Sequence, residues 1–327
     1  MDDNKLKIIE WNINCCKTSS LKLEKWKTIA KYISTESPDI LVLTECGTDF
    51  NNVNFCEMLK NLTNTEWEIC YNNDRTYNYI AVLVNTKNNS NIKVEIPNNP
   101  FDDNHTGIHP DRVAVDITFT DDSDDSSKSI RMLGIRMNTG GLTLEQRILQ
   151  NIQLVHDIQA LEPDIIIGDF NTCSEMESLN IYNAATWKNK NIIWEGKGKE
   201  RKLKPKFCKW NEWLNNLVES NENPPDVLAN FCNLIGNENK KYQYWAGDKR
   251  TLFSYKPIRS NISTAPDTLI WRSEPSEDDN DKPNPRYYPE IAQKQKPSDV
   301  VKDWPSDHCM LIADIEIPSE QHLAEDS

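Results

Sequence analysis

The sequence contains no apolar stretch that approaches the ~18 consecutive residues needed to span a membrane. It also lacks a CxxC pair and any Cys/His spacing typical of a zinc site. Its nine cysteines are odd in number and two are adjacent, Cys15 and Cys16, which indicates reduced thiols rather than a disulfide framework. The first residues run directly into a strand pattern, without the apolar core of a signal peptide. These absences predict a cytoplasmic protein with no membrane span.

The chain lacks a surplus of positive charge, which argues against nucleic-acid binding through its whole surface. The 37 Lys and Arg residues are outnumbered by 51 Asp and Glu, and the formal net charge is −14 at pH 7. Positive charge is concentrated in residues 188–210, which contain nine Lys and Arg, including Lys199, Arg201 and Lys202, but only two glutamates. Two interpretations of this basic segment stay open: a strip that binds a polyanion, or a solvated loop.

Apolar positions predict a repeated unit of helix, Pro-Asp turn and buried strand that ends in a carboxylate. In the first unit, a helical pattern leads to a strand at 40–43 and then to Glu45. In the second, a helical pattern leads to a strand at 165–167 and then to Asp169. Two related halves would place Glu45 and Asp169 at one end of two packed sheets.

The rest of the chain fits a single domain over residues 1–327. Alternating segments predict a β-meander with strands at 67–71, 79–84, 92–96, 113–119 and 130–137. Residues 172–250 are predicted to be a helical, basic, tryptophan-rich insertion, with amphipathic helices around 207–218 and 227–235. Most of its tryptophans are expected in the core, with one or two as base-stacking platforms. Residues 273–304 are predicted to form a long loop.

Polar side chains follow apolar runs at the points where the predicted strands end. They are Asn12, Glu45, Asp169, Asn171, Asp267, Asp307 and His308. Each alone is common as a turn, cap or surface residue, but their joint placement favours a site built from several strand ends.

Carboxylate and amide oxygens are the ligands of a hard divalent cation such as Mg²⁺ or Mn²⁺. Glu45 is the best candidate ligand, and Asn12 and Asp307 can complete the shell. Asp169 can orient or deprotonate a water, while the neighbouring Asn171 amide donates to a phosphoryl oxygen. A carboxylate beside His308 would fix its tautomer, which is the role predicted for Asp267. This combination predicts metal-assisted hydrolysis of a phosphoester.

The order of these motifs resembles the endonuclease/exonuclease/phosphatase superfamily, which includes deoxyribonuclease I-like and AP-endonuclease-like enzymes. The matching motifs are IEWN at 9–12, LTE at 43–45, IGDFN at 167–171, TLFS at 251–254 leading to DTLI at 267–270, and SDH at 306–308. The resemblance implies a four-layer α/β sandwich, with two packed, mainly antiparallel β-sheets flanked by helices. It also implies Mg²⁺-dependent hydrolysis by in-line attack of water on phosphorus.

The resemblance assigns roles to individual positions. They are the metal ligands Asn12, Glu45 and Asp307, the water-activating Asp169, the phosphate contact Asn171, and the Asp267–His308 pair that stabilises or protonates the phosphoryl group.

One position departs from the family pattern. Relatives commonly place a His or Tyr facing the scissile phosphate in the segment that matches residues 133–137, whereas this chain has Arg136. A guanidinium can bind a phosphate bidentately, but it cannot act as a general acid near neutral pH. Two other interpretations stay open, an offset of one residue in the register or a surface position of Arg136 on an edge strand.

Three functions are compatible with these residues. The first is a nuclease whose basic segment and tryptophans bind DNA or RNA. The second keeps the chemistry but acts as a phosphatase or phosphodiesterase on a phosphorylated small molecule or lipid head group, which the acidic body of the chain favours. The third is a catalytically inactive binding protein, against which the complete set of site residues argues.

Overall fold

The structure is a computed structural model. It describes residues 5–14, 22–46, 55–71, 80–86, 92–97, 101, 109–120, 127–137, 144–170, 192–195, 202–205, 231–233, 235–236, 241–245, 267–273, 283–290, 300–306 and 308–316. Within these ranges no helix combines the length and the apolar character needed to cross a membrane.

The first six-stranded sheet has the order β13-β14-β1-β2-β4-β3. Its strands are β1 (Lys5–Asn12), β2 (Ile40–Thr44), β3 (Trp67–Tyr71), β4 (Ala81–Asn85), β13 (Asn284–Tyr288) and β14 (Met310–Glu316). The β1–β2 pair is parallel, and the other pairs are antiparallel.

The second six-stranded sheet has the order β11-β12-β8-β7-β6-β5. Its strands are β5 (Ile92–Glu95), β6 (Asp111–Thr120), β7 (Ser127–Arg136), β8 (Ile165–Asp169), β11 (Lys241–Trp245) and β12 (Asp267–Ser273). The single parallel pair is β7–β8, so each sheet contains one parallel crossover and is otherwise antiparallel.

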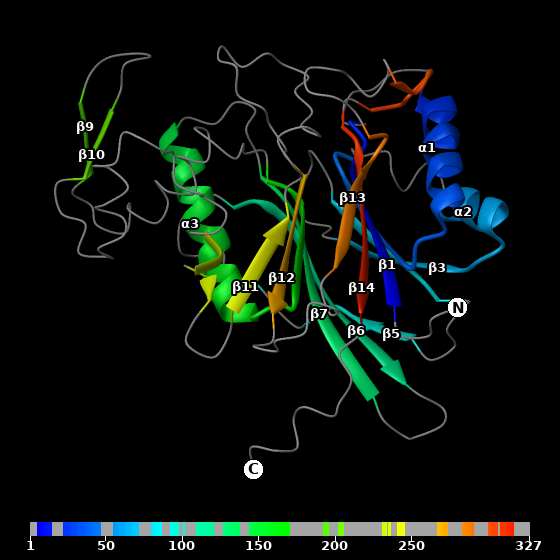
Figure 1. The fold of residues 1–327 in the computed structure, drawn as a ribbon, viewed down its shortest axis with the longest axis horizontal. Coiled ribbons are helices and arrows are strands. Elements are labelled where there is room, and N and C mark those ends of the chain that lie inside the picture. The colour runs from blue at the N-terminus through cyan, green and yellow to red at the C-terminus, as the bar shows by residue number, and fades with distance from the viewer. Residues whose placement is uncertain are drawn as a thin grey trace.

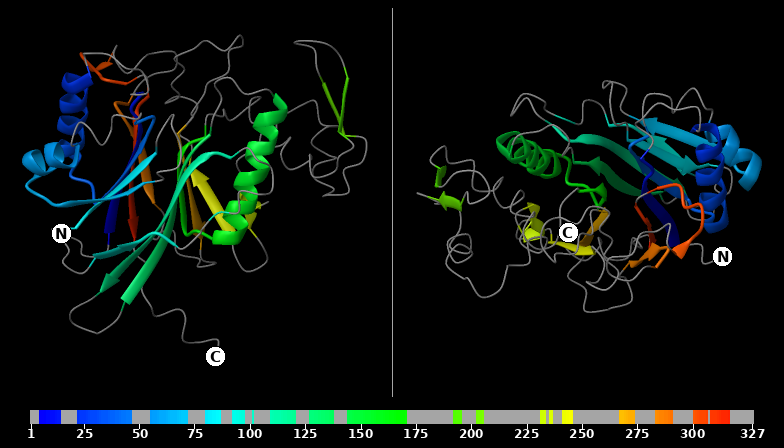
Figure 2. Two further views of the ribbon diagram at one scale, coloured as in Figure 1. Left: turned by 180° about the vertical axis from the view of Figure 1, so that it is seen from behind. Right: turned by 90° about the horizontal axis from the view of Figure 1, so that it is seen from above.

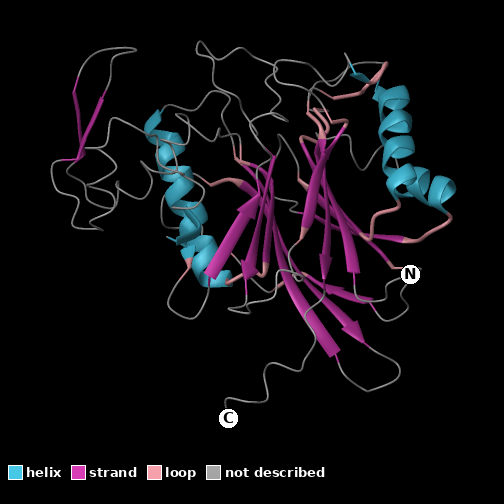
Figure 3. Cartoon of the chain, in the orientation of Figure 1, coloured by secondary structure: helices cyan, strands magenta, loops and turns pink. Residues whose placement is uncertain are grey.

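Helices cover the outer faces of the two packed sheets (Figure 1). Helices α1 (Lys22–Glu36) and α2 (Phe55–Thr63) lie beside the first sheet, and α3 (Leu144–Leu161) lies beside the second. The views from behind and from above show the same helix, sheet, sheet, helix order (Figure 2), and the strands of the two six-stranded sheets lie between the helices (Figure 3). This arrangement confirms the predicted four-layer α/β sandwich.

Strand β1 shows why the sequence folds in this way. Leu6 and Ile8 point into the core between the sheets, whereas Ile9 and Trp11 point into the core beneath α1 and α2. A strand that is buried on both faces has apolar residues in both phases. The β1 segment therefore has apolar residues in both phases, and its polar residues are Lys5, Lys7, Glu10 and Asn12.

The parallel crossovers bring the candidate site residues to one edge of the two sheets. In the first sheet Asn12 lies opposite Thr44, the residue before Glu45. In the second sheet Asp169 lies between Arg136 on β7 and Asp267 on β12. The predicted convergence of the two halves is thus confirmed at the level of strand register.

The structure differs from the sequence prediction in three places. Strand β13 lies within the predicted loop 273–304, where Tyr287 is buried and its hydroxyl donates to the backbone oxygen of Asp267. The insertion at 172–250 contains the strands β9 (Ile192–Glu195), β10 (Lys202–Pro205) and β11, and is helical only at 231–233 and 235 among its described residues. The expected helix at 207–218 lies outside the described residues. Helix α2 was not predicted.

Candidate active site

A hydrogen bond between two strand ends joins the sheets at the centre of the site. The side-chain nitrogen of Asn12, at the end of β1, donates to Oδ2 of Asp169, at the end of β8, over 2.8 Å. Both side chains are buried. The side-chain oxygen of Asn12 accepts from the backbone N–H of Asn14 over 3.0 Å, which fixes the orientation of the amide. Asn12 therefore presents its donor to Asp169 and holds that carboxylate in place.

Asp169 is a carboxyl group in an unfavourable place for charge. Complete burial raises its pKa, the nearby Asp267 raises it further, and the charge of His308 opposes both effects, with a net pKa of about 7. A carboxyl group in this range can exchange a proton near neutral pH, which is the property required of a general base.

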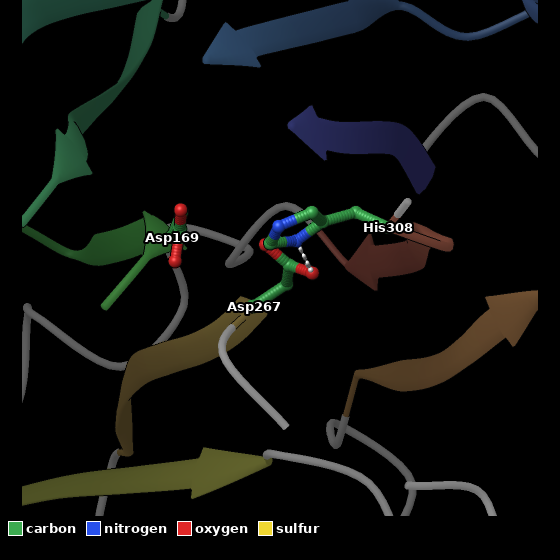
Figure 4. A group of neighbouring side chains, drawn as sticks. All are labelled: Asp169, Asp267 and His308. Carbon is green, nitrogen blue, oxygen red and sulfur yellow. Dashed lines mark hydrogen bonds and ion pairs between the residues drawn. The ribbon is translucent and has the colours of Figure 1, made fainter. Parts of the chain in front are cut away.

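His308 and Asp267 form the pair expected from the sequence. Nδ1 of His308 lies 3.0 Å from Oδ2 and 3.3 Å from Oδ1 of Asp267. A carboxylate accepts hydrogen bonds, so Nδ1 is assigned the proton, which fixes the tautomer and the orientation of the ring. Figure 4 shows the imidazole ring extending from its backbone toward Asp169, with Asp267 beneath it.

The backbone of His308 is held by three side chains, of which Trp11 and Ser306 lie in the matching motifs but had been given no role there, and Trp304 lies in none of them. The indole nitrogens of Trp11 and Trp304 both donate to its carbonyl oxygen, over 3.1 and 2.8 Å. Ser306 Oγ accepts from its N–H over 3.1 Å and donates to the backbone oxygen of Asn12. The serine of the Ser-Asp-His motif therefore ties His308 to the end of β1.

Arg136 lies at the end of β7 and is buried, with 5% of its surface exposed. Its Nη2 lies 2.5 Å from Oε1 of Glu45, and its Nη1 lies 3.4 Å from Oδ2 of Asp111. Since β7 lies between β6 and β8 in the sheet, the interpretation of Arg136 as a surface residue on an edge strand is wrong.

Glu45 follows β2 with φ of +56°, a left-handed conformation that is uncommon for residues other than glycine. Burial favours the neutral form of its carboxyl group, but the charge and hydrogen bond of Arg136 outweigh this and lower its pKa. Hydrogen bonding from Asn12 acts in the same direction. Glu45 is thus an ionised carboxylate beside Asn12.

Glu10 is a site residue that sequence reasoning missed. It lies on the same face of β1 as Asn12, is fully buried, and accepts a 3.3 Å hydrogen bond from the Thr44 hydroxyl. Burial and the charges of Asp267 and Asp169 raise its pKa well above the usual value. The sequence signal that could have identified Glu10 is a glutamate inside an otherwise apolar strand, two residues before Asn12 and therefore on the same face of that strand.

The donor set fits a divalent cation. Ligand atoms of Asp169, Asp267 and His308 all lie within 4.8 Å of one another. Burial, together with the charge of Asp267, raises the pKa of both Glu10 and Asp169, and a bound divalent cation would favour their ionised forms. Of the ligands expected from the sequence, Glu45 and Asn12 are adjacent, while Asp307 lies outside the described residues.

Four further residues remain untested by the geometry. Asn171, Lys199 and Arg201 lie outside the described residues, and for Lys202 only the backbone in β10 is described.

Comparisons with known proteins agree with this geometry. The endonuclease/exonuclease/phosphatase family profile matches residues 9–186, more than half of the chain. No curated protein matches the sequence significantly.

Two solved structures are similar in fold. A humanized TDP2 from D. rerio carrying 14 mutations has 14% sequence identity and a TM-score of 0.50, covering 95% of this chain and 99% of that one. ANGEL2, described as a 2′,3′-cyclic phosphatase, has 12% identity and a TM-score of 0.52, covering 96% and 95%. At these low sequence identities the similarity shows a shared fold alone.

Proposed function

The chain belongs to the endonuclease/exonuclease/phosphatase family of divalent-metal-dependent phosphoester hydrolases, and from this premise we propose that it cleaves phosphodiester bonds in DNA or RNA. The observation that carries the proposal is the buried cluster in which Asn12 contacts Asp169 and Asp267 contacts His308. This cluster places a candidate base and a candidate phosphoryl ligand side by side. In-line attack of water on phosphorus requires groups of these two kinds.

Asp169 is the proposed general base. The Asn12 hydrogen bond fixes its carboxylate, and a pKa of about 7 suits proton removal from water near neutral pH.

His308 is the proposed phosphoryl ligand. Asp267 holds Nδ1, and the two indoles hold the backbone carbonyl, so that Nε2 has a fixed direction. From this position it stabilises or protonates the phosphoryl group. Asn171, two residues after Asp169, is proposed to contact the phosphate, as is Arg136 through its guanidinium.

Glu45, Asn12 and Asp307 are the proposed ligands of Mg²⁺, with Mn²⁺ as a substitute. Carboxylate and amide oxygens match the preference of these cations. Asn12 would have to turn its oxygen, which accepts from the N–H of Asn14, toward the cation. When bound, the metal would stabilise the negative charge that develops on the phosphoryl oxygens.

The basic segment 188–210 is proposed to bind the polynucleotide backbone. Charge reversal at Lys199, Arg201 and Lys202 is expected to raise KM on a polynucleotide far more than it lowers kcat, because their proposed contacts are to backbone phosphates and not to the reacting centre. Binding should also weaken steeply with salt, since cationic side chains release counterions from phosphates. An unchanged KM would refute a role of this segment in substrate binding.

A second candidate substrate is a phosphorylated small molecule or lipid head group. The net charge of −14 disfavours a long polyanion outside the basic segment. ANGEL2, which shares the fold, is described as a 2′,3′-cyclic phosphatase.

We also propose a cytoplasmic location. Cys46, Cys56, Cys232 and Cys309 are free thiols among the described residues, which suits a reducing compartment.

A cleavage assay in Mg²⁺, Mn²⁺ or EDTA tests these alternatives. The substrates are supercoiled plasmid, linear single- and double-stranded DNA, RNA, and a chromogenic phosphodiester, with His308→Ala as the inactive control. Metal-dependent polynucleotide cleavage that the control lacks supports the nuclease, and plasmid nicking identifies endonucleolytic action. Hydrolysis of the small ester alone would transfer the proposal to the second substrate class. No hydrolysis of any substrate would favour a binding protein.

A further inference from the structure

A buried arginine occupies the space between two carboxylates from different sheets. Glu45 follows β2 of the first sheet, and Asp111 opens β6 of the second. The guanidinium of Arg136 contacts Glu45 with one η nitrogen and Asp111 with the other. The side chains of Arg136, Glu45 and Asp111 are 6%, 19% and 8% exposed, so water screens their charges poorly.

The pairing with Glu45 has a direct consequence for a cation. Glu45 is the carboxylate on which the proposed metal site depends, and Arg136 already neutralises it. A divalent cation that approaches Glu45 must either displace the guanidinium and break the ion pair, or bind beside a positive charge that repels it. In both cases Arg136 weakens the binding of the cation. Asp111 acts in the reverse direction, because its negative charge offsets that of Arg136.

The backbone conformation of Glu45 indicates that its carboxylate is held in one position. A left-handed conformation at a residue other than glycine persists only where the surroundings enforce it. The contact with Arg136, which lies 91 residues further along the chain, is one such constraint. Arg136 therefore determines both the charge and the position of this carboxylate.

We propose that Arg136 is a positioning residue that holds the metal ligand Glu45 in the metal-free enzyme and lowers the affinity of the site for a divalent cation. The proposal rests on the proposed function, because that function makes Glu45 a metal ligand. If Arg136 acted only by binding the substrate, its substitution would leave the metal affinity in the absence of substrate unchanged.

The test is a calorimetric titration of the purified, metal-free chain with Mn²⁺ in the absence of substrate. Removing the guanidinium charge with Arg136→Gln should tighten Mn²⁺ binding by roughly tenfold or more, since buried ion pairs exceed surface pairs in strength. Asp111→Asn leaves Arg136 without its offsetting charge and should weaken binding several-fold. Glu45→Gln should abolish the binding.

Arg112→Gln is the matched control. Arg112 is a buried arginine on the same strand as Asp111, and its guanidinium pairs with Asp157 over 2.7 Å instead of with Glu45. This variant should leave the Mn²⁺ affinity unchanged, although it removes a buried ion pair. Circular dichroism and the Tm in EDTA verify that each variant is folded. If Arg136→Gln does not fold, Arg136→Met, which removes the same charge, replaces it and should tighten Mn²⁺ binding in the same way; weaker or unchanged binding would overturn the inference.

The outcomes separate this inference from the proposed function. Weaker or unchanged Mn²⁺ binding in Arg136→Gln would overturn the inference, and metal-dependent cleavage by the wild-type chain would leave the proposed function standing. A wild-type chain that binds no Mn²⁺ and hydrolyses no substrate would overturn both.

Discussion

The substitution Asp169→Asn should make the protein inactive and more stable at the same time. Asparagine keeps the shape of the side chain, and its oxygen can accept the same hydrogen bond from Asn12. It removes only the ability to carry a negative charge in a fully buried position beside Asp267. The change therefore tests whether this charge opposes folding.

The size of the effect follows from the pKa of Asp169. It rises from 3.8 to about 7, or roughly three pH units at ~1.36 kcal/mol each. The ionised form thus costs up to about 4 kcal/mol of folding free energy at pH 8. Because the folded state holds the proton more tightly, wild-type stability falls as pH rises through the window from about 4 to 7. The variant should match the wild type near pH 4 and exceed it by several degrees in Tm at pH 8.

Thermal unfolding in EDTA between pH 4.5 and 8.5 measures this difference, together with hydrolysis at each pH. Glu24→Gln on the exposed surface of α1 is the control, and it should show no difference that grows with pH. A stability difference that is constant with pH, or an Asp169→Asn variant that is less stable than the wild type at pH 8, would refute the reasoning.

Three further changes have defined outcomes. His308→Gln should lower kcat by roughly 10²–10⁴ with little change in KM, as steady-state kinetics would show; an equal effect on both constants would contradict its role. Trp304→Phe removes one of the two N–H donors to the His308 carbonyl and should lower kcat by up to about tenfold, also at constant KM. Gly168→Ala should yield little folded protein, because its Cβ would lie 1.9 Å from the backbone oxygen of Ile135, whereas Gly134→Ala, which meets only side chains at 3.2 Å or more, should fold with a moderately lower Tm.

The sequence was sufficient to predict features that depend on local periodicity. The strand β2 and the position of Glu45 after it follow from four apolar residues and a Pro-Asp turn. The same pattern identified β8 and Asp169. Because the same unit occurs twice, two related halves were expected to bring Glu45 and Asp169 to one end of two packed sheets, without coordinates.

Features that depend on distant partners could not be predicted in this way. The pairing of Arg136 with Glu45 joins two sheets and has no local signal. Strand β13 was missed because its Asn-Pro-Arg-Tyr-Tyr sequence alternates weakly, and its place at the sheet edge is determined by pairing with β14. Glu10 was overlooked because it lies inside a strand, whereas the other site residues lie at strand ends.

The pairing of β1 with β14 has a consequence for protein synthesis. One side of β1 is left open until β14 has been made, and His308 is synthesised 297 residues after Trp11, the indole that holds its carbonyl. At ~5–20 residues per second, a growing chain spends roughly 15–60 s on the ribosome with Asn12 exposed and no His308 to complete the site. A chain at this stage lacks the His308 on which the proposed hydrolysis depends, so the site is completed only with the synthesis of the last strand of the first sheet.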